Sequence, residues 1–542
     1  MRKIGYASLV FTLASSLLLS ACSSTPATTS GDTKTVQAPA GQEMAINLAA
    51  EPSTADPGLA EDIPSMSVAR SAFDGLLRLG TDGKLHEAVA EKYEVSPDLL
   101  TYTFHLRDTK WSNGDPVTAH DFEYAWKRVL NPETASSYAY QMYYIKNAQN
   151  ANAKKASLDD VGVKATDDKT LVVTLEHPAA FFPELVASVT YFPVDKKVVE
   201  ANKDWAHEAA TYVGNGPFIM DKWEHKSQIV WKKNDTYWDK DNVKLGKLTF
   251  NMIEDPNTEL SMFEQGDLDW AGSPLSDLPG DAMQSLKSSG KLHNQPTAGT
   301  ELYVFNTSKV PFNNKNIRKA FSLAIDRKAL TDNVVTYTGT PAYGYLPPSM
   351  SLNPDGYYKD GDIAKAKELL AQGLKELGLK ELPPIELLYN TSEKHKRTAS
   401  AIQDEWRKAF GVDVKLVNQE NKVKREQMKQ GNFIIGRGSW IGDFNDPINF
   451  LELYRDLGGN NNARWTNPKF KELLVQSAAE GDQQKRKELL KQADAIFNDE
   501  MPIMPLYYYT YAWAQGDGVK DVVIDPLGFI DFKYASNEKK AK

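Results

Sequence analysis

The sequence predicts a mixed α/β protein, because strand-like and helix-like segments alternate along most of its length. Segments with the period-two alternation of half-buried strands lie at 101–108, 170–177, 228–234 and 247–254. Between them, TAHDFEYAWKRVL has the apolar spacing of an amphipathic helix. A strand, a helix and a second strand then follow one another at 384–419, in the order of a βαβ unit.

The helix beginning after Thr118 carries its own start signal. Thr118 stands in the N-cap position and Asp121 in the third helical position, which is the arrangement of a capping box. Phe122, Trp126 and Val129 then fall on one face of the helix. This face is expected to be buried.

The βαβ unit is the clearest pattern in the chain. PIELLYN, from Pro384, is strand-like, and the helix that follows places Ile402, Trp406 and Phe410 at helical spacing. Gly411 ends that helix, and VDVKLVNQ follows as a second strand. The two strands are expected to be parallel, with a right-handed crossover.

A third strand of the same sheet is predicted from FIIGRGSW. A short polar helix at 422–429 precedes it, and a helix with inward Ile448 follows it. Open sheets of this kind bind ligands beyond the carboxyl ends of their strands. Those ends carry His395, then 419–421, then 440–445, and these residues are the candidates for a binding site.

The stretch GRGSWIGDFNDP gathers charged and aromatic residues at one of these strand ends. Asp446 is interpreted as a helix cap before Pro447. Asp443 lies outside that helix and either folds into an Asx turn or faces a cleft. Arg437 either points toward the same cleft or is a surface charge, since two glycines leave the strand's regularity open.

The N-terminus predicts export and a lipid anchor. Two basic residues and an apolar run indicate a signal peptide at 1–21; the run is near the lower limit for a membrane span and carries several hydroxyl residues. Leu-Ser-Ala-Cys at 19–22 resembles the lipobox of bacterial lipoproteins, in which the cysteine is acylated. Cys22 is the only cysteine, so no intramolecular disulfide is expected. Lipidated Cys22 and a flexible tether would occupy 22–42, with the folded body starting near Glu43.

Composition and motifs argue against several functions. The net charge of −9 disfavours nucleic acid as a partner, because phosphate binding needs clustered positive charge. The chain shows no nucleophile elbow, zinc-protease motif or Walker loop, and its eight histidines lack metal-ligand spacing. No enzyme activity, metal or cofactor is therefore predicted. The tyrosine-rich segments SYAYQMYY and MPLYYYTYAW suit either a peptide pocket or ordinary strand packing.

Several segments resemble one known family. They are TYTFHLRDTKWSNGDPVTAHDFEYAWKRVLNPETAS, YVGNGPFIM, TPAYGYLPP, LLYNTSEKHKR, VDVKLVNQE and GRGSWIGDFNDP. In the same order, over essentially the whole mature chain, they are similar to the oligopeptide-binding proteins of bacterial oligopeptide ABC importers. The resemblance implies a monomer that captures short oligopeptides by lobe closure. It would lie at the outer face of the cell membrane in a Gram-positive-type cell, or on the periplasmic side in a Gram-negative cell. The resemblance also implies delivery to membrane permease and ATPase subunits, consistent with the missing Walker loop.

The family fold would be a periplasmic-binding-protein-like (Venus flytrap) fold with two lobes and an extra third domain. The resemblance places lobe I at 43–73, 196–298 and 513–542, the extra domain II at 74–195 and lobe III at 299–512.

The resemblance also implies roles for individual residues. Asp443 would pair with the peptide α-ammonium, and Arg437 and His395 would meet the C-terminal carboxylate for particular peptide lengths. Glu61 would lie at the cleft in lobe I. Main-chain groups in two segments would pair with the peptide backbone as an added strand. The residues are Gly438, Ser439 and Trp440 in the first segment, and Tyr303, Val304 and Asn306 in ELYVFN.

The sequence departs from the family pattern at positions that leave the preferred peptide open. Gly299 and Ile441 stand where some members carry a disulfide, Met428 replaces a second arginine, and Asn421 replaces a tryptophan. The same fold could bind dipeptides, murein peptides, signalling peptides or oligosaccharides. From a different class, Asp443 with Asp446 would suit a secreted hydrolase. A surface peptide sensor or chaperone without a permease would bind in the same way.

Overall fold

The structure is a computed structural model that describes residues 42–538. The predicted signal peptide, the lipidation site Cys22 and all of the predicted tether except Gln42 lie outside the described residues. Within residues 42–538, no helix is both long and apolar enough to cross a membrane.

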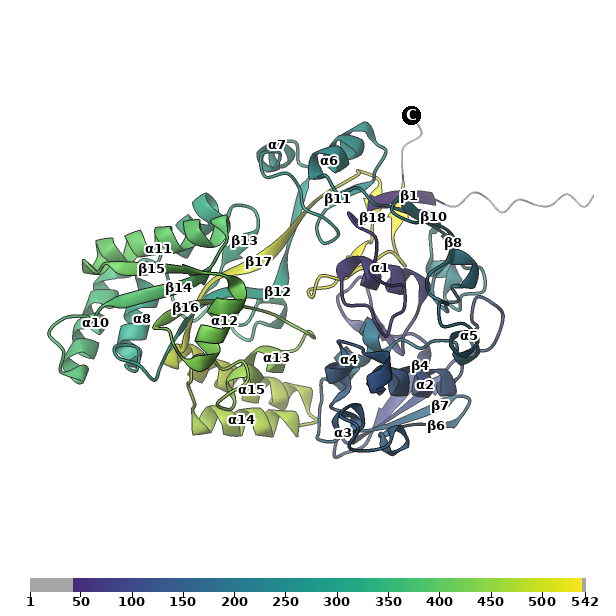
Figure 1. Ribbon diagram of the computed structural model, residues 1–542, viewed down its shortest axis with the longest axis horizontal. Helices are drawn as coiled ribbons and strands as arrows, with labels where there is room; N and C mark the ends of the chain where they lie inside the picture. Colours follow the sequence, from purple (N-terminus) through teal and green to yellow (C-terminus); the bar gives the residue numbers. More distant parts are fainter. Residues whose placement is uncertain (1–41, 539–542) are drawn as a thin grey trace, which may run out of the picture. The chain divides into compact units, whose positions relative to one another are not determined.

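The strands of residues 42–538 form three larger sheets and three two-stranded ribbons (Figure 1). The first sheet has the order β1 (Gln42–Asn47), β10 (Leu245–Asn251), β9 (Gln228–Lys233), β8 (Phe218–Glu224). The second has the order β4 (Ala90–Val95), β5 (Thr101–Leu106), β7 (Thr170–Thr174), β6 (Val163–Asp167). The third has the order β11 (Trp270–Gly272), β17 (Ile503–Gln515), β12 (Leu292–Phe305), β16 (Ile435–Ile441), β14 (Ile385–Asn390), β15 (Val414–Gln419), with β13 (Gly339–Pro341) beside β17. The ribbons are β2 (Leu77–Leu79) with β3 (Leu85–Glu87), β18 (Val519–Lys520) with β21 (Ser536–Asn537), and β19 (Val523–Ile524) with β20 (Ile530–Asp531).

Helices connect these strands and cover the sheets. Before β12 they are α1 (Ile63–Ala72), α2 (Ala119–Leu130), α3 (Ala148–Asn152), α4 (Phe182–Val186), α5 (Lys196–Ala201), α6 (Pro256–Gln265) and α7 (Met283–Ser288). After β12 they are α8 (Lys315–Leu323), α9 (Arg327–Leu330), α10 (Ile363–Leu377), α11 (Glu393–Phe410), α12 (Asn421–Gln430), α13 (Ile448–Leu451), α14 (Pro468–Ala478) and α15 (Gln483–Glu500). The mixed α/β class predicted from the sequence is confirmed.

The predicted start of α2 is confirmed in detail. The backbone N–H of Thr118 donates to the Asp121 carboxylate at 2.8 Å, and both halves of the capping box are present. Phe122, Trp126 and Val129 are buried, and the Trp126 indole donates to the carbonyl of Tyr191 at 2.8 Å. The amphipathic face therefore anchors this helix in the core.

The βαβ unit is confirmed as well. β14 and β15 pair in parallel over their whole length, with α11 between them in the chain. Ile402 and Trp406 are fully buried on α11, and Gly411 ends the helix with a φ of 69°, a conformation that suits glycine. The helix expected from Ile448 is short, because α13 ends at Leu451 and a 3-10 turn follows over Glu452–Tyr454.

Candidate functional site

Strand β16 organises the site because one of its edges is only partly covered. β12 pairs with β16 along Gly299–Phe305, whereas β14 pairs with it only at Ile435 and Gly436. Among the described residues, no strand pairs with that edge beyond Gly436. The second half of β16 thus offers main-chain groups to an added strand.

The Arg437 carbonyl shows which residues face the open edge. It accepts a hydrogen bond at 3.0 Å from the Nζ of Lys424 on α12, and this contact lies away from β12. In an antiparallel ladder, residues alternate between pointing toward one neighbour and toward the other. The main-chain groups of Ser439, two residues on, therefore point to the same open edge as those of Arg437.

The Arg437 side chain belongs to a buried ion pair. Its Nε donates to Glu301 Oε1 at 2.7 Å and its Nη2 donates to Glu301 Oε2 at 2.5 Å, with side chains 13% and 1% exposed. The Tyr509 hydroxyl also donates to Glu301. Burial lowers the pKa of the Arg437 guanidinium, but the pair with Glu301 raises it above its ordinary value, so this arginine stays charged. The possibility that Arg437 is a surface charge is therefore excluded.

Two further basic groups on α11 lie near this pair. Lys394 Nζ lies 5.4 Å from the ring centroid of Tyr507, and burial lowers its pKa. His395 is half-buried at the start of α11, and its Nδ1 has no hydrogen-bond partner among the described residues. Burial, then the charge of Arg437, lowers its pKa. The charged groups that surround Glu301 thus include more cations than carboxylates.

Asp443 lies just beyond the end of β16, where the sequence placed a candidate ligand group. It is half-buried, and among the described residues no Lys, Arg or His nitrogen comes within 4 Å of its carboxylate. Tyr140, from the first tyrosine-rich segment, donates its hydroxyl to Asp443 Oδ1 at 3.2 Å. Burial raises the pKa of the Asp443 carboxyl. Such an uncompensated carboxylate is suited to receive a cation.

Asp446 has a structural role at the start of α13, but it precedes the N-cap, which is Pro447 and not Asp446 as the sequence predicted. Its Oδ1 accepts the backbone N–H of Ile448 at 2.9 Å, at the start of α13, where Pro447 is the N-cap. Two hydrogen bonds of 2.7 Å join it to Arg486 of α15. With its charge paired in this way, Asp446 is a poor partner for Asp443 in acid–base chemistry.

The prediction for the ELYVFN segment was wrong. Tyr303 and Val304 lie in β12, which pairs with β16 on one side and β17 on the other, so no edge is left for a peptide backbone. Asn306 is fully buried and donates to the carbonyls of Gly431 and Phe433 at 3.1 Å. These residues hold the sheet together, although the Val304 side chain lines a cavity beside β16.

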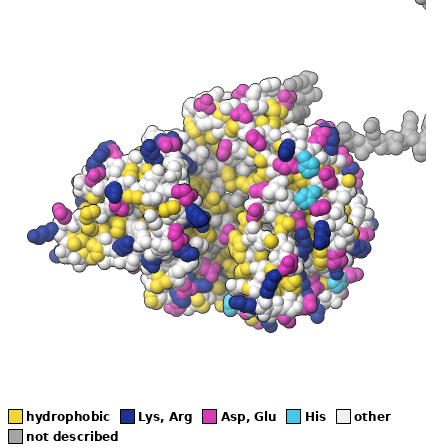
Figure 2. Space-filling model, viewed as in Figure 1, with side chains coloured by type: hydrophobic (Ala, Val, Ile, Leu, Met, Phe, Trp, Pro, Cys, Tyr) yellow, Lys and Arg dark blue, Asp and Glu magenta, His cyan; other side chains and the backbone are white. Residues whose placement is uncertain are grey.

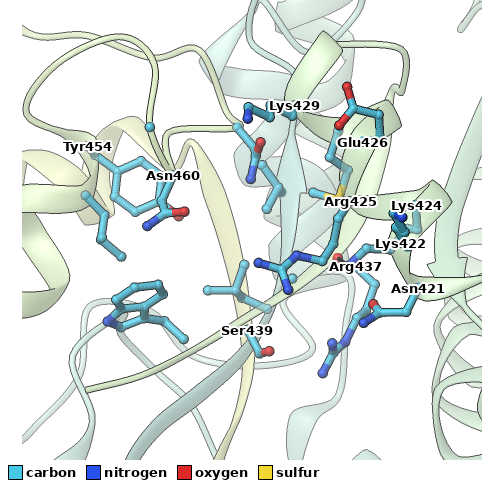
Figure 3. Close-up of a pocket in the computed structure, with 18 of the residues that line it drawn as sticks. Asn421, Lys422, Lys424, Arg425, Glu426, Lys429, Arg437, Ser439, Tyr454 and Asn460 are labelled. Carbon is cyan, nitrogen blue, oxygen red and sulfur yellow. Dashed lines mark hydrogen bonds between the residues drawn. The ribbon is translucent and has the colours of Figure 1, made fainter. Parts of the chain in front are cut away.

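Two cavities adjoin the open edge. One, of about 730 Å³, lies between α12 and β16 (Figure 3), and its lining includes Gly438, Ser439 and Trp440. The other, of about 400 Å³, is lined by Asp443, Trp440 and aromatic side chains that include Tyr140 and Tyr144. Because Trp440 lines both cavities, the predicted residues of β16 and Asp443 belong to adjoining cavities.

Glu61 does not line either cavity, but its charge acts on Tyr138, which Asp443 also affects. It is exposed just before α1, and its charge acts with that of Asp443 on Tyr138, whose pKa is raised chiefly by burial. Sequence reasoning missed Glu301, Tyr509, Lys424 and the contact of Tyr140 with Asp443. The tyrosine-rich segments were the one available signal, since they contain Tyr140 and Tyr509.

The face of the molecule drawn in Figure 2 has a mixed charge distribution. Basic and acidic side chains are interspersed over the face drawn in Figure 2, with no single basic field of the kind that binds nucleic acid. Within residues 42–538, no group of three or more His, Cys, Asp or Glu side chains is arranged to hold a metal ion.

Comparison with known proteins identifies close relatives. A model described as bacterial extracellular solute-binding proteins, family 5 Middle, matches residues 84–462. The chain is 49% identical to the oligopeptide-binding protein OppA of Bacillus subtilis (strain 168), over 97% of each chain.

Solved structures share the fold. The murein tripeptide-binding protein MppA in its unliganded open form matches with a TM-score of 0.85 and 33% identity, over 92% of this chain and 97% of that one. Listeria monocytogenes OppA bound to peptide matches with a TM-score of 0.65 and 31% identity, over 92% of this chain and 100% of that one.

Proposed function

The chain belongs to the bacterial extracellular solute-binding proteins of family 5, a two-lobed mixed α/β fold, and on that premise we propose that it captures short oligopeptides, largely independent of their sequence, for an ABC importer. Membrane permease and ATPase subunits would receive the peptide. The observation that supports this most directly is the open edge of β16 with an uncompensated carboxylate just beyond it.

The proposed binding mode uses features that all peptides share. The main chain of the Gly438, Ser439 and Trp440 segment pairs with the peptide backbone as an added strand, chiefly through Ser439, whose N–H and C=O face the open edge while those of its two neighbours face β12. Asp443 receives the α-ammonium, because it lacks a cation of its own. Arg437 and His395, which belong to the cation-rich cluster around Glu301, meet the C-terminal carboxylate for particular peptide lengths. Peptide side chains would occupy the two cavities, where water can fill the remaining space.

Glu61 completes the proposed site from lobe I. It is exposed in this structure, and its charge and that of Asp443 act on the same tyrosine, Tyr138. Lobe closure would bring such groups around the ligand, with the peptide shifting an open–closed equilibrium toward the closed state.

The sheets support the proposed domain boundaries. Apart from Gln42, the first residue of β1, the sheet β1-β10-β9-β8 falls within 43–73 and 196–298, assigned to lobe I. The sheet β4-β5-β7-β6 falls within 74–195, assigned to domain II. Most of the third sheet falls within 299–512, assigned to lobe III. Long β12 and β17 run across the proposed boundaries at 298 and 512, and such strands would serve as the connections between lobes.

We further propose that the protein is a monomer anchored by a lipid on Cys22 to the outer face of the cell membrane, and that it performs no chemistry. The lipobox-like sequence supports the anchor. Growth with labelled palmitate tests it, since label should enter the native chain and not a Cys22→Ser variant.

Titration with defined peptides tests the binding function. Free oligopeptides of varied sequence should bind and should be recovered intact, whereas oligosaccharides should not bind. Dipeptides and murein peptides belong in the same panel, because the family also includes proteins named for those ligands. Failure of every peptide to bind, or hydrolysis of a bound peptide, would contradict the proposal.

A further inference from the structure

The cavity between α12 and β16 has an unusual charge balance. Lys422, Lys424, Arg425 and Lys429 of α12 line it together with Arg437 of β16 (Figure 3). Within residues 42–538, no carboxylate comes within 4 Å of the side-chain nitrogen atoms of the four α12 cations. Exposed lysines elsewhere in this acidic chain often form ion pairs with Asp or Glu. The cavity therefore carries positive charge that the protein does not neutralise.

The carboxylates near the cavity are already engaged. Glu301 holds Arg437 through two hydrogen bonds. Glu420 caps α12 by accepting the backbone N–H of Lys422 at 2.8 Å, and Glu426 accepts from the Gln430 amide at 2.8 Å. None of these groups is placed to neutralise Lys424.

Lys424 is the most unusual of the cations because it is only 5% exposed. Among residues 42–538, the Arg437 carbonyl is the one hydrogen-bond partner of its ammonium, which leaves two of the three N–H donors for another partner. Burial, then the charge of Arg437, lowers its pKa to about 8, while Glu301 opposes this shift and Arg425 adds to it. A buried ammonium without a carboxylate is costly unless a ligand supplies one.

The position of Lys424 connects this charge to the open edge of β16. Its ammonium contacts the main chain of Arg437, next to the groups of Ser439 that face the same edge. A peptide added along this edge would run past Lys424, with the cavity beside it. A carboxylate of that peptide could reach the ammonium without displacing any ion pair of the protein.

We propose that the cavity between α12 and β16 is a site for a carboxylate of the bound peptide, with Lys424 as its principal charge partner. This inference rests on the proposed peptide-binding function and adds a preference for acidic ligands to it. The carboxylate comes either from the C-terminus of a short peptide or from an Asp or Glu side chain of a longer one. Lys424 is thereby a residue that determines specificity.

Matched peptide pairs distinguish the two sources. One arm compares free-acid and amidated C-termini at several lengths, and the other compares Glu with Gln at each position of a longer peptide. The acidic member of at least one pair should bind about ten- to 100-fold more tightly, which is the range for hydrogen bonds to charged groups. The Lys424→Met variant, which keeps an apolar stem, should lose that preference.

Lys491→Met is the matched control, because this substitution removes the same charge as Lys424→Met. Lys491 is exposed on α15 and lies outside the cavity. It should keep the preference. The proposal would be overturned if the unmodified protein showed no preference for acidic peptides, or if both variants showed an equal preference. It would also be overturned if Lys424→Met lost affinity equally for acidic and neutral peptides, which is the result expected if Lys424 only supports the strand. Absence of binding by all peptides would overturn the proposed function along with it.

Proton uptake gives a second test that needs no variant. A bound carboxylate would raise the pKa of Lys424 from about 8, so at pH 8 the acidic peptide should take up about half a proton more than its neutral partner. Calorimetry in two buffers of different ionisation enthalpy measures this difference in proton uptake. Any proton taken up by the peptide N-terminus is the same for both peptides and cancels in the comparison. Equal proton uptake by the two members of the preferred pair would overturn the proposal.

Discussion

Replacing Asp443 by Asn removes one charge from the site and keeps the size of the side chain. Asp443 lies half-buried beyond β16, with the Tyr140 hydroxyl at 3.2 Å and no cationic side chain within 4 Å among the described residues. Its proposed partner is the peptide α-ammonium, which would lose its counter-charge in the variant. Leaving one charge of a desolvated pair alone costs on the order of 3 kcal/mol, which is a roughly 100-fold rise in Kd.

The assay compares the free-amine and N-acetylated forms of one peptide by calorimetry. The unmodified protein should prefer the free amine by roughly 100-fold, and Asp443→Asn should bind both forms with similar, weak affinity. Because burial raises the pKa of Asp443, the preference should also fall as pH decreases through that raised pKa and the carboxylate becomes protonated. Because burial disfavours the ionised form of the Asp443 carboxyl in the folded protein, Asp443→Asn should keep or raise the Tm at pH 7. Retention of the free-amine preference in a folded variant would refute the assignment.

Two further predictions concern stability. Arg437→Met should lower the free energy of unfolding in urea by about 3 to 5 kcal/mol, because it leaves Glu301 charged at 1% exposure; adding Glu301→Gln should recover a large part of this loss. Glu184→Gln should stabilise the fold by on the order of 4 kcal/mol at pH 8 and by only about 1 kcal/mol at pH 5. Burial, then Asp525 and Asp446, raises the pKa of Glu184 from 4.5 to about 8, so the folded state favours its neutral form and stability falls as pH rises through this range.

These two predictions fail in different ways. If the double variant is as unstable as Arg437→Met alone, the loss comes from packing and not from an unpaired Glu301. If Glu184→Gln changes the Tm equally at pH 5 and pH 8, the Glu184 carboxyl does not titrate across that range in the folded protein.

Local patterns accounted for the parts of the fold that neighbouring residues determine. The capping box at Thr118 and the glycine stop at Gly411 depend on hydrogen bonds and backbone freedom within a few residues. The βαβ unit at 384–419 depends on a single short crossover, and its parallel pairing was predicted correctly. The position of Asp443 at the carboxyl end of a strand followed from the same unit.

Contacts between distant strands could not be predicted from these patterns. The pair of Glu301 with Arg437 joins positions 136 residues apart and depends on the register of β12 against β16. The same register places Gly299 opposite Ile441, the two positions that the family resemblance had matched to a disulfide. Tyr303 was matched to a peptide-pairing segment by the family resemblance, which did not show that both edges of its strand are occupied.

Mass spectrometry of the molecules released from the purified protein by acid tests the central claim most directly. Mature protein prepared without a tag should release mixed short peptides of varied sequence and a narrow range of lengths, and among them acidic residues should be enriched if the Lys424 site operates. Release of an oligosaccharide instead, or an empty protein that then binds no member of a peptide library, would contradict the conclusion that this chain captures oligopeptides.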